Sequence, residues 1–301
     1  MPDARTKTVD LAGTFESQRP HLRAVAYRML GSLAEAEDAV QDAWLRASRA
    51  DGAKIENLGG WLTTIVARLC LDRLRSRASR HEESLDVSLP DPVVSAADGV
   101  DPEQEALLAD SVGLAMLIVL EQLTPAERLA FVLHDTFGLP FDQIAPVIGR
   151  TREATRQLAS RARRRVRGAG VEASTEVPLR RQWELVDAFL AAARDGDLAA
   201  LMEILDPDVV ARADPGAGSN LLGRARSLRG AEAVGSSALA FARLAPGARR
   251  ALVNGAPGFV VLVGDRRYAV LGFTFGHDRI SEIDILLDPA RLARLDLAAV
   301  L

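Results

Sequence analysis

The sequence predicts a multidomain protein in which two all-α domains are followed by an α+β domain. Up to residue 168, apolar residues recur every three or four positions, which is the spacing of amphipathic helices. An acidic, proline-bearing stretch at residues 82–110 divides these helices into two groups, and from residue 249 onward the pattern turns to strands. The predicted domains are residues 1–80, 111–168 and 180–301, with linkers at residues 81–110 and 169–179.

Composition and charge exclude several classes of protein. The 301 residues are 48% hydrophobic, enough for a substantial core, and carry a formal net charge of −4. The single cysteine, Cys70, excludes an internal disulfide and a cysteine-rich metal site, and the four histidines have no metal-ligand spacing. There is no apolar run of about 18 residues and no apolar signal core at the N-terminus. We therefore expect a cytoplasmic protein that needs no membrane, metal or cofactor.

The first two expected helices span residues 15–30 and about 33–50. Gly31-Ser32 ends the first helix and caps the second. The expected buried side chains of the second helix are Ala36, Ala39, Val40, Ala43, Trp44 and Ala47. Its outer face is mainly acidic and consists of Glu35, Asp38, Gln41, Asp42 and Arg46.

Residues 61–80 are expected to form a basic helix that Trp61 opens. Its apolar stripe consists of Leu62, Ile65, Val66 and Leu69. Five arginines against one aspartate give it about +4, and these arginines are Arg68, Arg73, Arg75, Arg77 and Arg80. Cations for phosphates and an aromatic wall for an unstacked base suit single-stranded or distorted DNA. The alternative is a solvated charged face with Trp61 as a core anchor.

A second basic segment, residues 139–167, has the pattern of a helix-turn-helix. Gly149 supplies the turn, because glycine enters left-handed backbone conformations cheaply, and Thr151 is a good N-cap for the helix that follows. Pro146 should kink or shorten the first helix. The first helix is expected to bury Phe141, Ile144, Ala145 and Ile148, and the second Ala154, Leu158 and Ala162.

The opposite face of this second helix is suited to DNA. Residues 150–167 contain eight arginines and one glutamate, so the segment carries about +7 inside an acidic chain. In such motifs the N-terminal part of the helix reads base edges, and later basic residues hold phosphates. The DNA-facing residues are Arg152, Glu153, Arg156 and Gln157 for reading, then Ser160, with Arg163, Arg164 and Arg167 for anchoring. The alternative is an ordinary helical hairpin with a solvated charged face.

Together these motifs resemble the extracytoplasmic-function sigma factors of bacterial RNA polymerase. The segments that carry the resemblance, over roughly residues 12–168, are AEDAVQDAWLRA, WLTTIVARLCLDRLRSR and LEQLTPAERLAFVLHDTFGLPFDQIAPVIGRTREATRQLASRARRRV. The resemblance implies contacts with the β′ clamp helices and the β flap of core polymerase. The residues implied at the clamp are Glu35, Asp38, Gln41 and Asp42. Those implied at the −10 element of promoter DNA are Asn57, Leu58, Trp61, Arg68 and Arg75, while residues 111–167 would read the −35 element.

The acidic stretch at residues 82–110 has the composition of a linker. It holds nine acids and no lysine or arginine, alongside three prolines, and such a composition resists packing. It could shield the basic domains when DNA is absent, or serve solubility alone. Residues 88–92, Ser-Leu-Pro-Asp-Pro, resemble the Trp-Leu-Pro-Glu-Pro signature of the SigJ-like subgroup, which carries an extra C-terminal domain.

The C-terminal part is expected to place helices before a curved antiparallel sheet. The expected elements are helices in residues 183–193 and 195–209, a hairpin of residues 259–263 and 266–275, a turn at residues 276–278 and a strand through Ile280, Ile283 and Ile285. Residues 180–301 resemble the SnoaL-like domains, which are cone-shaped folds around a pocket. The segments that carry this resemblance are FLAAARDGDLAALMEILDPDVV and ISEIDILLDPARLARL.

This second resemblance implies a pocket in which an unknown small ligand could bind. In SnoaL-type cyclases an acid and a histidine act inside the cone, so Asp214, His277 and Asp284 are the residues to weigh. His277 falls in a turn, where a solvated histidine is expected, and Asp284 could face either the cavity or solvent. We expect no catalysis. The loop that the subgroup uses for regulation corresponds here to Asp214, Gly216 and Gly218, without the subgroup's lysine.

The sequence therefore predicts a promoter-specific initiation factor for RNA polymerase that its own C-terminal domain regulates in cis. A ligand-sensing regulator with one helix-turn-helix is the first alternative, and it leaves the first eighty residues unexplained. The second is a cyclase or isomerase fused to a DNA-binding segment, in which mutation of Asp214 or Asp284 would abolish turnover.

Overall fold

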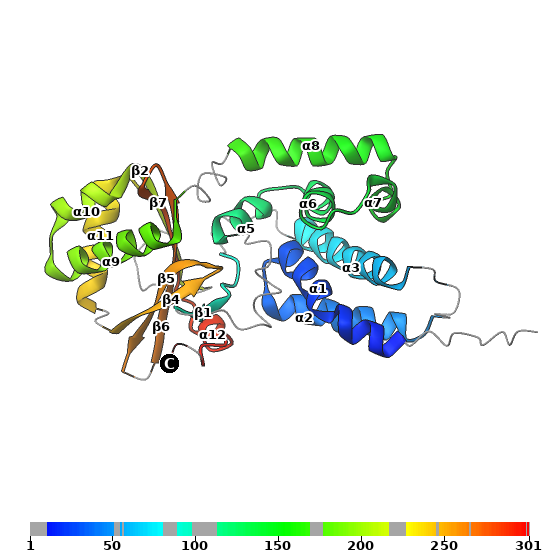
Figure 1. Cartoon of the computed structure of the whole chain (residues 1–301), viewed down its shortest axis with the longest axis horizontal. Coiled ribbons are helices and arrows are strands. Elements are labelled where there is room, and N and C mark those ends of the chain that lie inside the picture. The colour runs from blue at the N-terminus through cyan, green and yellow to red at the C-terminus, as the bar shows by residue number, and fades with distance from the viewer. Residues whose placement is uncertain are drawn as a thin grey trace, which may run out of the picture. The chain divides into compact units, whose positions relative to one another are not determined.

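The protein consists of two compact units. The computed structural model describes residues 11–50, 55, 57–80, 89–97, 113–168, 177–216, 227–244, 247–264, 266–298 and 300. One unit combines residues 1–83 with 120–165, and the other combines residues 84–119 with 166–301. The first is helical, and the second is built on a sheet (Figure 1).

The first unit places two groups of helices together. Its elements are α1 (Leu11–Leu30), α2 (Leu33–Ala47), α3 (Leu58–Arg80), α6 (Pro125–Phe131), the π-helical turn η2 (Val132–Thr136), α7 (Phe141–Ile148) and most of α8 (Arg152–Gly168). Helices α1, α2 and α3 pack around a core of fully buried side chains that includes Phe15, Leu22, Val40, Leu62 and Val66. The periodicity of the apolar residues predicts these three helices correctly.

Helix α2 buries the alanines that its sequence predicts. Ser32 caps it by accepting a hydrogen bond from the backbone N–H of Glu35 at 3.4 Å. The buried residues are Ala36, Ala39, Val40, Ala43 and Ala47, whereas Trp44 is only half-buried and lies against the ring of Phe15. The inward face of α2 is therefore made almost entirely of small side chains.

The second helix of the helix-turn-helix is rotated from its predicted orientation. Its buried residues are Thr155, Ala159, Ala162 and Val166, while the predicted Ala154 and Leu158 are half-buried. The prediction assigned no inward position to a polar residue, but the Thr155 hydroxyl donates to the Thr151 carbonyl at 2.9 Å and is satisfied inside the helix. The predicted turn is confirmed, since Gly149 has a φ of 74° and Thr151 accepts from the Ala154 N–H at 3.2 Å. Helix α7 runs through Pro146 and ends at Ile148.

The second unit is a seven-stranded sheet with helices. The strand order is β1-β4-β5-β6-β7-β2-β3. The strands are β1 (Val94–Ala96), β2 (Leu205–Asp214), β3 (Ser227–Arg229), β4 (Gly247–Val253), β5 (Ala256–Val263), β6 (Arg266–Gly276) and β7 (Arg279–Leu286). The helices are most of α5 (Leu114–Glu121), α9 (Leu179–Asp195), α10 (Leu198–Ile204), α11 (Ala231–Leu244) and α12 (Pro289–Leu292).

The sheet is mixed, which corrects the antiparallel prediction. Strands β4 to β7 form an antiparallel meander that contains the predicted hairpin, but β2 runs parallel to β7, with Ala211 opposite Ile283. Helices α9 and α11 cover one face (Figure 1). Phe189 of α9 meets Phe273 edge-on with ring centroids 5.3 Å apart, and Phe273 meets Phe259 in the same way at 5.6 Å. The apolar core of the unit lies between these helices and this face.

The helix predicted over residues 195–209 ends early. It stops at Ile204, and the chain continues as β2. Pro207 has no N–H to continue a helix, and the Asp206 carboxylate instead accepts from the Asp208 N–H at 2.8 Å. Strand β3 and helix α11 were not anticipated.

The predicted linker is not unpacked throughout. Leu89 to Ser95 are buried, and β1 pairs antiparallel with β4, with Val94 opposite Val253. The acidic composition averaged over residues 82–110 concealed this local run of apolar residues. The prediction that the whole stretch resists packing is therefore wrong for residues 89–97.

Candidate functional site

All four predicted DNA-reading side chains on α8 are exposed. Arg152, Glu153, Arg156 and Gln157 project from its first two turns into solvent. The Arg156 guanidinium donates to the Glu153 carboxylate at 2.9 Å in an exposed pair, which is too weakly held to keep either side chain from DNA. The N-terminal end of α8 thus presents a polar and cationic surface.

The anchoring arginines of α8 divide into two groups. Arg164 and Arg167 are exposed, but the Nε of Arg163 lies 2.6 Å from a carboxylate oxygen of Asp135 in η2. Arg165 donates to the buried carboxylate of Glu127 at 2.9 Å and so ties α8 to α6. Ser160 is half-buried. Part of the +7 charge therefore serves packing, which charge counting along the sequence could not reveal.

Helix α3 begins before Trp61. As a result, two residues that were predicted to contact the −10 element have structural roles in the helix. The Asn57 side-chain oxygen accepts from the Gly60 N–H at 3.0 Å, so Asn57 caps the helix. Leu58 is 8% exposed and packs in the core, so its side chain is not open to solvent as its predicted place at a captured base would suggest. Trp61 is half-buried and Arg68 is exposed. Residues 51–54 and 56, part of the predicted −10 segment, lie outside the described residues.

Arg75 joins the two halves of the first unit. Its guanidinium donates to the Ile148 carbonyl at the end of α7, at 3.3 Å. Nearby, the Nε of the buried Arg128 on α6 donates to the Arg28 carbonyl on α1 at 3.1 Å, and burial lowers the pKa of Arg128 to about 10. The Arg28 guanidinium lies over the ring of Phe137, 5.0 Å from its centroid. No local sequence signal indicated these contacts.

The acidic face of α2 is only partly open. Asp38 and Gln41 are exposed, whereas Glu35 and Asp42 are half-buried and bound by arginines of α3. Arg73 donates to the Asp42 carboxylate at 2.7 Å and to the Glu35 carbonyl at 2.9 Å. Two of the four predicted polymerase contacts are thus already engaged within the unit.

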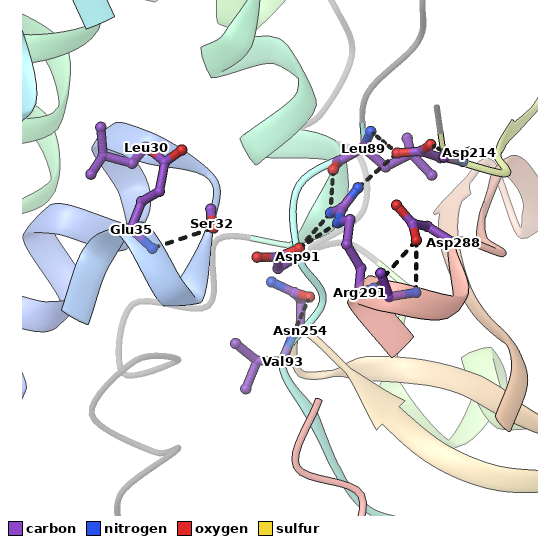
Figure 2. Close-up of polar contacts among 12 residues, drawn as sticks. Leu30, Ser32, Glu35, Leu89, Asp91, Val93, Asp214, Asn254, Asp288 and Arg291 are labelled. Atoms are coloured by element: carbon purple, nitrogen blue, oxygen red, sulfur yellow. Dashed lines mark hydrogen bonds and ion pairs between the residues drawn. The ribbon is translucent and has the colours of Figure 1, made fainter. Parts of the chain in front are cut away.

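In the second unit, a cluster that we call the linker clamp consists of Leu89, Asp91, Asp214 and Arg291 (Figure 2). The Arg291 guanidinium donates to Asp91 at 2.7 Å, to Asp214 at 2.7 Å and to the Leu89 carbonyl at 2.6 Å. Asp214 also accepts from the N–H groups of Leu89 at 2.9 Å and Gly216 at 3.0 Å. The predicted regulatory-loop residue Asp214 therefore binds the chain segment between the two predicted helical domains. Gly218 lies outside the described residues.

Asn254 extends this attachment along the same segment. Its side-chain oxygen accepts from the Val93 N–H at 3.1 Å, and its own N–H donates to the Val93 carbonyl at 2.8 Å (Figure 2). The left-handed φ of 51° at Asn254 places both groups opposite Val93. Sequence reasoning missed Asn254, although an Asn-Gly pair is a known turn signal.

Asp284 faces neither the cavity nor solvent, contrary to both options that its sequence position left open. It is 2% exposed and accepts from Arg212 at 3.0 Å. Burial raises the pKa of Asp284 to about 7, against the opposing effect of the Arg212 guanidinium. His277 is exposed in the β6–β7 turn with a φ of 51°, as expected for a solvated histidine.

A cavity of about 180 Å³ lies between the sheet and the helices α9 and α11. Its apolar lining includes Phe189, Ala211, Phe241, Phe259, Leu271 and Ile283. Within the described parts of the chain, no group of His, Cys, Asp and Glu side chains could hold a metal ion. None of the helices described is long and apolar enough to cross a membrane.

Comparison with known proteins decides the family. Sigma-70 region 2 matches residues 14–80, and Sigma-70 region 4 matches residues 115–166. The chain is 36% identical over 283 residues to the Mycobacterium tuberculosis protein named "Probable ECF RNA polymerase sigma factor SigI", covering 94% of each. The chain belongs to the ECF RNA polymerase sigma factors. This ECF sigma factor is also 44% identical to ECF RNA polymerase sigma factor SigJ of M. tuberculosis over 200 residues, which is 66% of this chain and 64% of SigJ.

A solved structure gives the same result for the fold. The crystal structure of M. tuberculosis SigJ aligns with this ECF sigma factor at a TM-score of 0.75 and 34% identity, covering 95% of this chain and 99% of SigJ. The resemblance and the multidomain fold class, two helical sigma regions followed by a SnoaL-like α+β domain, are therefore confirmed. A ligand-sensing regulator with a single helix-turn-helix is not favoured.

Proposed function

We propose that this ECF sigma factor reads the −35 element with the first two turns of α8. The observation that carries the proposal is the exposed row of Arg152, Glu153, Arg156 and Gln157 at the N-terminal end of that helix. Arginine and glutamine side chains in this position can bond base edges in the major groove. Arg164 and Arg167 then hold phosphates and contribute affinity without sequence preference.

We place the −10 contacts on α3 and its N-terminal end. Asn57, Trp61 and Arg68 remain candidates, because each keeps part of its side chain accessible. Arg75 is also exposed, and it is a further candidate although its guanidinium donates to the Ile148 carbonyl at 3.3 Å. Core polymerase contacts α2 at its exposed residues Asp38 and Gln41. The complex of polymerase and sigma factor then binds promoter DNA in the cytoplasm, where polymerase works.

Regulation in cis acts through the linker clamp. Arg291, Asp214 and Asn254 hold residues 89–93 against the C-terminal domain. Because this segment lies between regions 2 and 4 in the sequence, its attachment limits how far the two regions can separate. Linkage within one chain supplies the high effective concentration that a separate inhibitor would lack.

Run-off transcription with bacterial core polymerase tests this function. We expect initiation that requires the sigma factor, that is lost when Asp38 and Gln41 are both changed to arginine, and that changes in rate with Arg291→Ala. Wild-type transcription from the Asp38→Arg, Gln41→Arg variant would contradict the assigned polymerase surface. Equal rates for Arg291→Ala and wild type would contradict control by the clamp.

We also propose that the C-terminal domain binds a small ligand and catalyses no reaction. The cavity supports binding, since apolar cavities of similar volume accept benzene-sized molecules. Against catalysis, Asp214 is held in the linker clamp, and Asp284 alternates with the cavity-lining Ile283 and so points to the opposite face of the sheet. Turnover of a small apolar compound that stops with Asp284→Asn would overturn this part of the proposal.

A further inference from the structure

We infer that Arg73 and Arg77 of the basic helix α3 are positioning residues for polymerase binding, which act by bracing α2. The inference rests on the proposed polymerase surface of α2. On this inference Arg73 and Arg77 do not contribute to DNA binding by α3. Glu35 and Asp42, which were predicted to contact polymerase, instead hold α2 in place.

The exposed and engaged residues of α2 lie on different sides of the helix. Ala34, Asp38, Gln41, Leu45 and Ser48 are exposed and follow one another at intervals of three and four residues, which makes a single stripe. Leu45 is 50% exposed, an unusual state for a large apolar side chain, and it gives this polar stripe an apolar centre. A stripe of this kind is suited to contact with another protein.

Glu35 and Asp42 lie seven residues apart, two turns of helix, along the side of α2 that faces α3. Arg73 spans these two turns, because one guanidinium nitrogen donates to the Glu35 carbonyl at 2.9 Å and another to the Asp42 carboxylate at 2.7 Å. Arg77 pairs with the Glu35 carboxylate and donates to the Leu30 carbonyl at the end of α1, at 3.3 Å. The two arginines thus fix both the start of α2 and its rotation about its own axis.

Small side chains make up most of the buried face of α2, while Trp44 lies half-buried against the ring of Phe15. The buried residues are four alanines and Val40, and such short side chains form low ridges that interlock weakly with neighbouring helices. Polar contacts therefore help to decide which residues the helix presents. Arg73 and Arg77 of α3 hold one edge of α2, and Arg19 of α1 donates to the Glu37 carboxylate at 3.0 Å on the other edge. Since the polymerase surface is the exposed stripe beside the edge held by Arg73 and Arg77, a small rotation of α2 would move Asp38 and Gln41 away from their partners.

A double-mutant cycle on the full chain tests the brace. We expect Arg73→Gln and Asp42→Asn each to weaken binding to core polymerase by roughly tenfold, and the double variant to be no weaker than either single one. Binding is measured at a temperature where circular dichroism shows every variant folded. The matched control is Asp72→Asn, which changes an exposed aspartate on α3 that belongs to none of the proposed binding surfaces and should leave core affinity unchanged.

Each other outcome overturns the inference in a recognisable way. If losses from Arg73→Gln and Asp42→Asn multiply, Asp42 contacts polymerase directly. Arg73→Gln could instead bind core normally but reduce by about 1 the slope of the logarithm of promoter affinity against the logarithm of salt concentration. In that case Arg73 contacts DNA. If Asp38→Arg binds core as tightly as wild type, the proposed surface itself is wrong, whereas loss with Asp38→Arg and normal binding with Arg73→Gln refutes only the brace.

Discussion

Replacing Arg291 by alanine should release residues 89–93 from the C-terminal domain while the domain itself stays folded. The side chain joins two acids that are nearly buried, Asp91 at 12% exposed and Asp214 at 8%, and it also holds the Leu89 carbonyl. The substitution leaves both carboxylates without their shared cation. The segment should therefore detach far more often than in the wild-type protein.

The magnitude follows from the burial of the cluster. Removing one partner of a buried ion pair costs about 3–5 kcal/mol. Arg291 keeps 21% of its side chain exposed, so water can partly replace it and the lower end, about 3 kcal/mol, applies. Since about 1.4 kcal/mol corresponds to a factor of ten, local opening should become roughly 100-fold more frequent.

Hydrogen exchange measured by mass spectrometry reads this opening directly. The amides of Leu89 and Val93 donate to Asp214 and Asn254, so a peptide that contains them should exchange roughly 100-fold faster in Arg291→Ala. Arg294→Ala is the matched control, since Arg294 is exposed and lies one turn further along. Unchanged exchange in Arg291→Ala, or equal acceleration in the control, would refute the reasoning.

Three other predictions concern separate parts of the chain. Arg156→Ala should relax discrimination among −35 variants by roughly 1–3 kcal/mol, and unchanged preference in a −35 panel would remove Arg156 from the reading face. Arg164→Ala should instead weaken binding to all sequences alike and reduce by about 1 the slope of log affinity against log salt concentration. Because burial raises the pKa of Asp284 to about 7, the folded domain retains a proton that the unfolded chain releases near pH 4. The free energy of unfolding should therefore fall as pH rises from about 4 to 7, and Asp284→Asn should flatten this dependence in urea titrations; an equal slope in both proteins would contradict the assignment. Ala211→Leu should fill the cavity, so benzene should raise the melting temperature of the wild type but not of this variant, and an equal rise in both would place the binding elsewhere.

The features that the sequence predicts well are those set by near neighbours. Helix periodicity, the Ser32 and Thr151 caps and the Gly149 turn depend on residues within four positions, and each is found where it was expected. The same local patterns, in their order and spacing, identified the family. In α8 the buried stripe is shifted by one residue from its predicted position. Thr155 can lie inward because its hydroxyl is hydrogen-bonded within its own helix.

Only the tertiary structure decided which charged side chains are free to act. Asp214 meets Leu89 from 125 positions away, Arg291 meets it from 202, and Arg73 meets Asp42 from 31. Nothing within a few residues of any of these side chains specifies its partner. The local sequence does not distinguish an arginine that faces solvent from an arginine that bridges two helices. The sequence by itself determined the family, the helical regions and the exposed residues in the first two turns of α8. The packing of distant segments determined that the linker joins the sheet, that Asp284 is buried, and that half of the acidic face of α2 is already bound.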